Sequence, residues 1–410
     1  MMLTEKFYNV FVTQIRIFSL FCAIPYRWDD TSAKLRAASF VTTWIWKCLS
    51  LIQIRYAIFL IVRLVQSFMD PDYSSAAKLA IFGWVSLHNC SAVWYIPLFF
   101  KRDMIMEVFN FMIDFERRDL DYPRPKRSQR EEDCLYFLHL ISTILTVVVP
   151  YVIPFAFWLH PCAPQFLSSM VLTCPSRGNW TWTFLILKLL FLAVEIIASQ
   201  QMVLHTIFML FTCYYLMISS LGAYLEYIKT IRLNHFHFRP LFVKKLTLYR
   251  RLQLLTTIIN ECFHTTLLLF KIILSTVLMT LIYFFVKLFR PDTVFPVIGQ
   301  VCIHLSLMAA LCTLYLVYGT AGKIYRNSEK VVTQWKRLGQ INRLQWIRIN
   351  FQAMQPIAIR MGYGSFAFIK PCTWLSVIYF CVKHVVLLLI MSGDHLTTVF
   401  ERYNNIKERG

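Results

Sequence analysis

The chain has 410 residues, of which 57% are hydrophobic and only 16% are charged, and its mean hydropathy is +0.53. A soluble protein of this length needs more polar surface, so the composition excludes soluble and disordered classes and predicts a chain solvated by lipid. The formal net charge of +20 comes from 42 Lys and Arg against 22 Asp and Glu, and where these residues fall matters more than their total.

Seven stretches of the chain are long and apolar enough to cross a bilayer, whose core of about 30 Å needs about 20 helical residues. We therefore predict an all-α polytopic membrane protein with seven transmembrane helices. The expected spans are residues 40–65, 79–100, 135–159, 183–206, 265–289, 295–321 and 371–391.

The fourth apolar stretch continues beyond its span to Leu225, which makes it about twice as long as the membrane core requires. Two crossings are the alternative, but Ser199–Gln201 at the necessary hairpin has no turn signal. We prefer one crossing and a helix that continues into the cytoplasm. Because its apolar surface must be covered, we expect the extensions 207–264 and 322–362 to form a compact domain beside the membrane.

The orientation follows from the basic residues, which are enriched in cytoplasmic loops. Twenty-eight of the 42 Lys and Arg lie in four segments on one side of the spans, and seven lie on the other side. The basic segments are residues 1–39, 101–133, 226–262 and 322–362. The N-terminal segment 1–39 is therefore expected in the cytoplasm, the tail 392–410 outside the cell, and the protein in the plasma membrane.

The loop after the third span carries residues that suit an extracellular position. Asn179 begins an Asn-Trp-Thr sequon for N-glycosylation. Cys162 and Cys174 lie in the same loop, where an oxidising compartment would permit a disulfide. The bridged and the reduced state both stay open.

Three ionisable residues fall near the middle of a span, where a charge costs roughly 2.5 to 3.5 kcal/mol and needs a partner or a wet cavity. They are Arg55, Glu195 and Lys383. We expect these buried charges to neutralise one another in part. For Glu195, an ion pair that orders the bundle and a role in ligand binding or gating both remain open.

The outer halves of the second to sixth spans are rich in aromatic and mildly polar residues, as ligand pockets are. Such residues also pack without any ligand, and both interpretations stay open. Together with Glu195, the candidates for ligand binding are Trp84, His88, Tyr151, Trp158, Tyr283, Gln300 and His304.

Several patterns of other protein classes are missing or incomplete. There is no Gly-rich phosphate loop, catalytic carboxylate pair or nucleophile elbow, so we predict no enzyme and no cofactor. Glu261 and His264, or His235 and His237, have metal-like spacing but lack further ligands. The basic loops are typical of segments beside anionic membrane lipid, not of a nucleic-acid surface.

The predicted topology and a few short motifs resemble the insect gustatory and odorant receptor superfamily. The motifs are Ala23-Ile24-Pro25-Tyr26, the pair Asp29-Asp30, and Gly364-Ser365-Phe366 before the last span. Gustatory receptors end that span with Thr-Tyr, five hydrophobic residues and Gln-Phe. This chain keeps the spacing but has Lys383-His384 and Ile390-Met391 at the four named positions.

The resemblance implies a tetrameric ligand-gated cation channel whose pore is lined by the last span and whose small-molecule ligand binds in the outer half of the bundle. In this chain the pore or gate would then include Lys383, Leu387, Ile390 and Met391. Four copies of Lys383 around a pore would repel cations. The resemblance implies a homo- or heterotetramer with related subunits and no G protein.

Two further hypotheses remain beside the ligand-gated channel. One is a non-conducting subunit of the same fold that binds a small molecule or serves as a partner. The other is a transporter, which would usually show internal repeats or paired broken helices, and the sequence has neither. A G-protein-coupled receptor is disfavoured by the cytoplasmic N-terminus.

Overall fold

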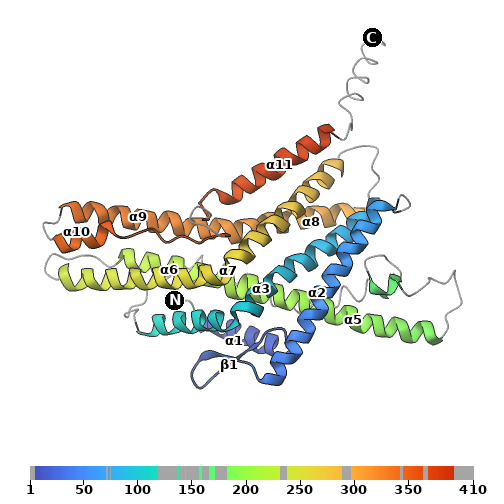
Figure 1. Cartoon of the computed structure of the whole chain (residues 1–410), viewed down its shortest axis with the longest axis horizontal. Coiled ribbons are helices and arrows are strands. Elements are labelled where there is room, and N and C mark those ends of the chain that lie inside the picture. The colour runs from blue at the N-terminus through green and yellow to red at the C-terminus, as the bar shows by residue number, and fades with distance from the viewer. Residues whose placement is uncertain are drawn as a thin grey trace, which may run out of the picture.

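The structure, a computed structural model, describes most of the chain. The described residues are 5–70, 73, 75–118, 137, 140, 144, 157, 158, 166–170, 182–230, 238–288, 297–341, 345–362 and 368–391. Within them the fold is helical, as predicted, and long helices cross near the centre of the molecule (Figure 1).

The N-terminal part combines a short helix, a hairpin and two long helices. Its elements are α1 (Glu5–Leu20), β1 (Tyr26–Asp29), β2 (Lys34–Ala37), α2 (Phe40–Met69) and α3 (Ser75–Arg118). The antiparallel hairpin was not expected from the sequence. Its side chains alternate, since Tyr26, Trp28 and Leu35 are buried and their neighbours are more exposed, which is the period of a half-buried sheet.

The rest of the described chain is built from helices. They are η1 (Leu167–Met170), α5 (Trp182–Ile207), η2 (Phe208–Tyr215), α6 (Leu216–Thr230), α7 (Phe238–Leu288), α8 (Val297–Leu314), η4 (Tyr315–Gly319), α9 (Thr320–Ile341), α10 (Gln345–Gln352) and α11 (Thr373–Met391). Two of them, η2 and η4, have the wide turns of a π-helix.

Five helical stretches among the described residues are long and apolar enough to cross a membrane. They are Phe40–Met69, Leu185–Lys229, Val243–Val286, Ile303–Arg337 and Thr373–Ile390, and each overlaps a predicted span. The predicted span 79–100 forms the first half of α3 but is less apolar, since it carries His88 and Asn89. The predicted span 135–159 lies largely outside the described residues. The chain is a multi-pass membrane protein.

The fourth predicted span belongs to a helix that continues without a turn. α5, η2 and α6 run end to end from Trp182 to Thr230, so Ser199–Gln201 lies inside a helix. In the apolar part of this helix 78% of the residues are buried, against 17–39% in the other four candidate spans. The other helices therefore pack around this one.

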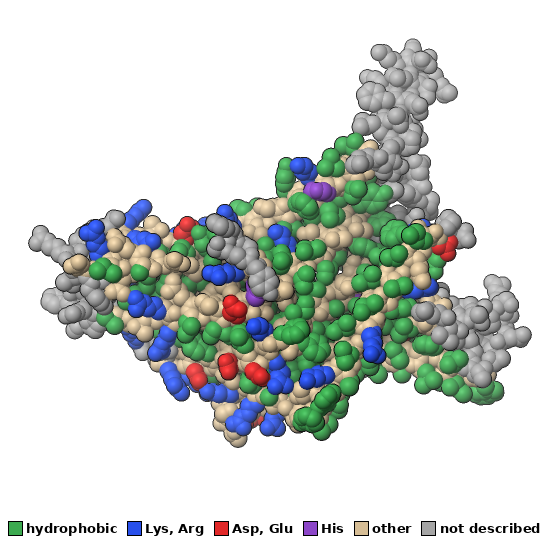
Figure 2. Space-filling view, viewed as in Figure 1, with side chains coloured by type: hydrophobic (Ala, Val, Ile, Leu, Met, Phe, Trp, Pro, Cys, Tyr) green, Lys and Arg blue, Asp and Glu red, His purple; other side chains and the backbone are tan. Residues whose placement is uncertain are grey.

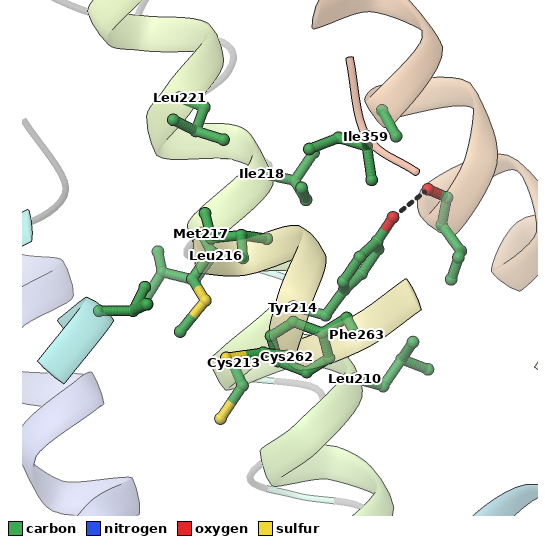
Figure 3. Close-up of a cluster of buried hydrophobic side chains, with 14 of the residues drawn as sticks. Leu210, Cys213, Tyr214, Leu216, Met217, Ile218, Leu221, Cys262, Phe263 and Ile359 are labelled. Atoms are coloured by element: carbon green, nitrogen blue, oxygen red, sulfur yellow. Dashed lines mark hydrogen bonds between the residues drawn. The ribbon is translucent and has the colours of Figure 1, made fainter. Parts of the chain in front are cut away.

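The centre of the packing lies where η2 and η4 meet (Figure 3). The Tyr214 hydroxyl in η2 donates a hydrogen bond of 3.1 Å to the Val317 carbonyl in η4, and its ring packs against Phe263 of α7 at 5.8 Å. Tyr318 of η4 donates in turn to the Leu267 carbonyl of α7 at 3.0 Å. Both π-helical segments thus lie at the crossing of three long helices, which their tyrosines link.

The surface divides into a charged part and an apolar part. Figure 2 shows that Lys, Arg, Asp and Glu side chains gather over the half of the molecule that contains α6, α9 and α10, whereas hydrophobic side chains dominate the other half. Many large hydrophobic residues of α2, α5, α8 and α11 are exposed. Such a surface suits a bilayer around one half of the molecule and water around the other.

α11 extends away from the body of the molecule (Figure 1). It packs on α7 through one face only, where Val377, Cys381 and Val385 are buried and the Cys381 thiol lies 3.5 Å from the Ser275 carbonyl oxygen. Its start approaches α9 closely at Gly322, because a Cβ there would lie 2.6 Å from the Lys370 carbonyl oxygen.

We predict that Gly322→Ala destabilises the protein by about 1–3 kcal/mol, because the added methyl group forces the backbone before α11 away from α9. Gly222→Ala is the matched control: Gly222 is also helical, but a Cβ there has no neighbour within 4 Å, so alanine should stabilise α6 by up to about 1 kcal/mol. Thermal unfolding of the detergent-solubilised protein measures both. Equal midpoints for the two variants would contradict the close contact.

Candidate functional site

A group of polar and aromatic residues is enclosed by α2, α3, α5 and η1. We call it the Glu195 cluster, and it consists of Gln53, Tyr56, Trp84, His88, Leu167 and Glu195. It contains three of the predicted ligand residues, and it lies at a small apolar cluster, separate from the main core, that Tyr56, Leu60 and Ala198 form.

Glu195 accepts two hydrogen bonds in a short network. The Tyr56 hydroxyl donates to Glu195 Oε2 at 2.6 Å, and the backbone N–H of Leu167 donates to Oε1 at 3.1 Å. Glu195 is only 2% exposed. A buried carboxyl group is costly unless it has hydrogen-bond partners, so these two donors explain how Glu195 is accommodated in an apolar span.

His88 of α3 contacts two residues of α2. Its Nδ1 atom lies 2.8 Å from Nε2 of Gln53, and its ring centroid lies 4.7 Å from that of Tyr56, with the two rings tilted by 35°. The amide oxygen of Gln53 is buried and has no hydrogen-bond partner among the described residues. The Glu195 cluster therefore contains an acceptor that a ligand could satisfy, because buried polar atoms are normally paired.

An aromatic wall borders the polar groups. The ring of Trp84 lies 5.8 Å from His88 and 6.1 Å from Phe166, and Phe166 contacts Phe157 edge to face at 5.2 Å. Phe166 precedes η1, which supplies the N–H group to Glu195. The wall and the network together give an apolar surface with a few convergent polar atoms, as binding sites have.

Helical spacing explains why these residues meet. Gln53 and Tyr56 are three residues apart on the buried face of α2, which also contains Ser50 and Leu60. Trp84 and His88 are four residues apart on α3, so they share one face as well. From α2, only Arg55 was predicted to have a role, and Gln53 and Tyr56 were not predicted. A polar Gln inside an apolar stretch was the sequence feature that could have indicated Gln53.

Arg55, Glu195 and Lys383 are not brought together. Arg55 and Lys383 are exposed on the surface of the single chain, and no ion pair within the described part of the chain includes any of the three. The expected mutual neutralisation is therefore not found. Glu195 instead accepts hydrogen bonds from the neutral phenol of Tyr56 and from a backbone N–H. Arg55 points away from Glu195, because it is one residue, or about 100° of helix, from Tyr56.

The other predicted ligand residues form separate groups. Trp158 lies beside Lys188, whose Nζ atom is 4.2 Å from the indole ring and donates to the Trp158 carbonyl at 3.1 Å. Gln300 and His304 belong to α8, where His304 Nδ1 is 2.8 Å from the Gln300 carbonyl oxygen. Tyr283 lies on α7.

Five predicted positions lie outside what the structure describes. They are Tyr151, Cys162, Cys174, Asn179 and the side chain of Met391. The disulfide and the glycosylation site thus remain predictions. Within the described ranges no group of three His, Cys, Asp or Glu residues is arranged to hold a metal ion.

A second buried polar group lies further along α5. The ring of His205 stacks on Tyr95 of α3 with centroids 3.5 Å apart and an interplanar angle of 5°. Neither nitrogen of His205 has a hydrogen-bond partner in the part of the chain that the structure describes. His205 was not among the functional residues predicted from the sequence.

Most of the chain matches solved structures of an insect olfactory receptor. The olfactory receptor OR5 of the insect Machilis hrabei aligns with a TM-score of 0.58 and 12% identity, over 93% of this chain and 99% of that chain. The chain has the fold of an insect olfactory receptor. The same receptor in complex with eugenol aligns with a TM-score of 0.59 and 11% identity, over 94% and 99% of the two chains.

The fold agrees with the all-α architecture that the resemblance noted in the sequence implies. No protein-family model matches the sequence, and no curated protein matches it. The likeness therefore rests on helix arrangement and not on shared residues.

We predict that Tyr56→Phe destabilises the protein by about 1–3 kcal/mol, because it leaves a buried carboxyl group without one of its two donors. Tyr379→Phe is the matched control, since Tyr379 is 71% exposed on α11 and should change the midpoint little. Thermal unfolding in detergent compares them. A midpoint for Tyr56→Phe equal to that of the control would contradict the importance of this bond.

Proposed function

We propose that the chain is a chemosensory receptor subunit that binds a small, mostly apolar molecule in the outer half of its helix bundle. The observation that carries this proposal is the fold match, which extends over 93–94% of this chain and includes a receptor solved with eugenol. Because a shared fold alone does not imply a shared function, the chemistry of the Glu195 cluster supplies the second argument.

The Glu195 cluster suits an aromatic or aliphatic ligand with a hydroxyl group. The rings of Trp84 and Phe166 offer apolar contact, and the unpaired Gln53 oxygen offers an acceptor for a hydroxyl donor. Tyr56 and Glu195 form a hydrogen bond that such a ligand could also join. The cluster has a carboxyl group and no cationic group among its members, so it disfavours anionic ligands.

We further propose that α11 lines a pore between four subunits in the plasma membrane, with a cytoplasmic N-terminus and an extracellular tail. Lys383, Leu387 and Ile390 are spaced i, i+4 and i+7, so they form one stripe, and all three are exposed. The stripe lies opposite Cys381 and Val385, which pack toward α7. The exposed apolar residues Leu387 and Ile390 of this stripe are suited to contact other copies.

The second candidate function is that of a non-conducting subunit, and the positive charge of Lys383 is the argument for it. A ring of four exposed ammonium groups would repel cations from a shared pore. Such a subunit would still bind a ligand in the Glu195 cluster and associate with related receptors. In either form the proposed role is that of a receptor and not of an enzyme.

The ligand site is tested by calcium imaging of cells that express the protein with a panel of small apolar compounds that includes eugenol. We expect Trp84→Ala to raise the concentration for half-maximal response about tenfold or more, as loss of a buried aromatic contact does. Trp182→Ala is the matched control, because Trp182 is 81% exposed. Surface labelling must show equal expression. An unchanged response in Trp84→Ala would contradict this site.

The role of Lys383 is tested by patch-clamp recording with a compound from the same panel. If Lys383 lines the pore, Lys383→Ala should increase cation permeability relative to chloride, because it removes the repelling charge. Lys370→Ala, just before α11, is the control. A large cation current that Lys383→Ala leaves unchanged would exclude control of permeation by Lys383. Ligand binding without current would support the non-conducting subunit.

A further inference from the structure

The N-terminal hairpin and α3 form a hollow beside the start of α2. Its volume is about 470 Å³, which is in the range of small-ligand sites. Three basic side chains line it, Arg27, Lys34 and Arg36, together with the polar Ser32 and Asn110. No acidic residue lines the hollow, so its own side chains attract anions.

Strand pairing concentrates the positive charge. Arg27 of β1 is directly opposite Arg36 of β2, and side chains at opposed positions lie close together on one face of a hairpin. Lys34 is two residues from Arg36, and Asp29 is two residues from Arg27 and opposite Lys34, so this face carries three cations and one carboxylate. Like charges at opposed positions destabilise a hairpin, so an anion bound between them would remove a repulsion that the hairpin otherwise bears.

The nearby carboxylates neutralise two of the three cations. Asp29 lies 2.7 Å from Arg36, and Asp114 lies 2.7 Å from Lys34. Hydrogen bonds from Ser32 and Thr31 lower the pKa of Asp29 to about 2, with a smaller contribution from Arg36, so Asp29 stays ionised at neutral pH. Both ion pairs are partly exposed, and such pairs are weak enough to rearrange around a ligand.

Arg27 is the cation without a partner. Its side chain is exposed, and no ion pair or hydrogen bond joins it to another described residue. A free guanidinium group presents a fork of N–H donors that matches phosphate oxygens. Beside Arg36 and Lys34, it gives the hollow the charge and the geometry for a phosphate group.

The hollow is preformed because its walls are bonded to one another. Asn110 of α3 accepts a hydrogen bond from the Leu35 N–H and donates one to the Leu35 carbonyl, both at 2.9 Å. The Tyr26 hydroxyl donates to the Arg102 carbonyl at 2.7 Å. These bonds fix both strands on α3, so binding requires little reorganisation.

The position of the hollow indicates where its ligand comes from. α2 begins at Phe40, three residues after β2, and its first turns expose Phe40 and Trp44, with the Lys47 ammonium 5.3 Å from the Trp44 ring. Exposed aromatic rings at the start of a span are typical of the headgroup layer. The basic residues of the sequence predict the cytoplasmic leaflet, which is rich in anionic lipid.

We propose that this hollow binds the phosphorylated headgroup of an anionic membrane lipid, and that Arg27 holds its phosphate. The ligand is a lipid and not a soluble anion, because the hollow adjoins the bilayer surface. The inference concerns a site separate from the Glu195 cluster and does not depend on the receptor function.

The test uses the full chain purified in detergent and measures binding by microscale thermophoresis. The probes are dioctanoyl phosphatidylinositol bisphosphate, dioctanoyl phosphatidylcholine, inositol trisphosphate and inorganic phosphate. We expect the phosphorylated lipid to bind most tightly and Arg27→Gln to weaken it about fivefold or more, the usual effect of one basic residue at an anionic membrane surface. Arg27→Lys should restore binding in part, since lysine keeps the charge but not the fork.

Lys330→Gln is the matched control, because it removes the same charge from an exposed position on α9 outside the hollow. It should leave lipid binding unchanged, and both variants should keep the thermal midpoint of the wild type. Equal weakening by Lys330→Gln would overturn the site in favour of a general charge effect. Equal affinity for phosphatidylcholine would overturn the role of the phosphate, and equal affinity for the two soluble anions would overturn the assignment to a lipid.

Discussion

One apolar helix is longer than the apolar core of a bilayer is thick, and the other helices pack around it and bury it. α5, η2 and α6 form this helix, and most of its residues from Leu204 to Leu225 are buried, with none of them exposed. Lipid can solvate only about 20 residues of it, so protein must cover the remainder. α7 and α9 pack against α6 and cover it. The charged surface over α6, α9 and α10 is the outside of that packing.

The sequence predicted the parts of the fold that depend on long-range composition. Apolar stretches located the helices, and the absence of a turn signal at Ser199–Gln201 correctly favoured one continuous helix. The hairpin was missed because two strands of four residues carry too short an alternation to stand out. The partners of Glu195 were not predicted, because the prediction considered only charged residues, whereas the actual partners are a phenol and a backbone N–H. Which face of α2 meets α5 is a property of the packed structure, and it separates Tyr56 from the neighbouring Arg55.

The two proposed sites share one helix. α3 carries Trp84 and His88 in its first half and Asn110, which holds the hairpin, in its second half. Between them the helix is interrupted at Lys101, four residues after Pro97, where φ is −132° and ψ is 24°. A proline removes a helical hydrogen bond and commonly bends the helix there. A ligand at one end and a lipid at the other would therefore act on two rigid rods joined by a bend, with the buried helix α5 packed against α3.

The wide turns of η2 and η4 lie where a change of helix register would alter the helix crossing. A π-helical turn holds one residue more than an α-helical turn, so converting it changes the helix register by one residue, which corresponds to about 1.5 Å along the axis and about 100° around it. Tyr214 of η2 bonds to a carbonyl of η4, and Tyr318 of η4 bonds to a carbonyl of α7, so a change of register in either segment would break one of these hydrogen bonds. Each change of register would also exchange the residues that these helices turn toward α7.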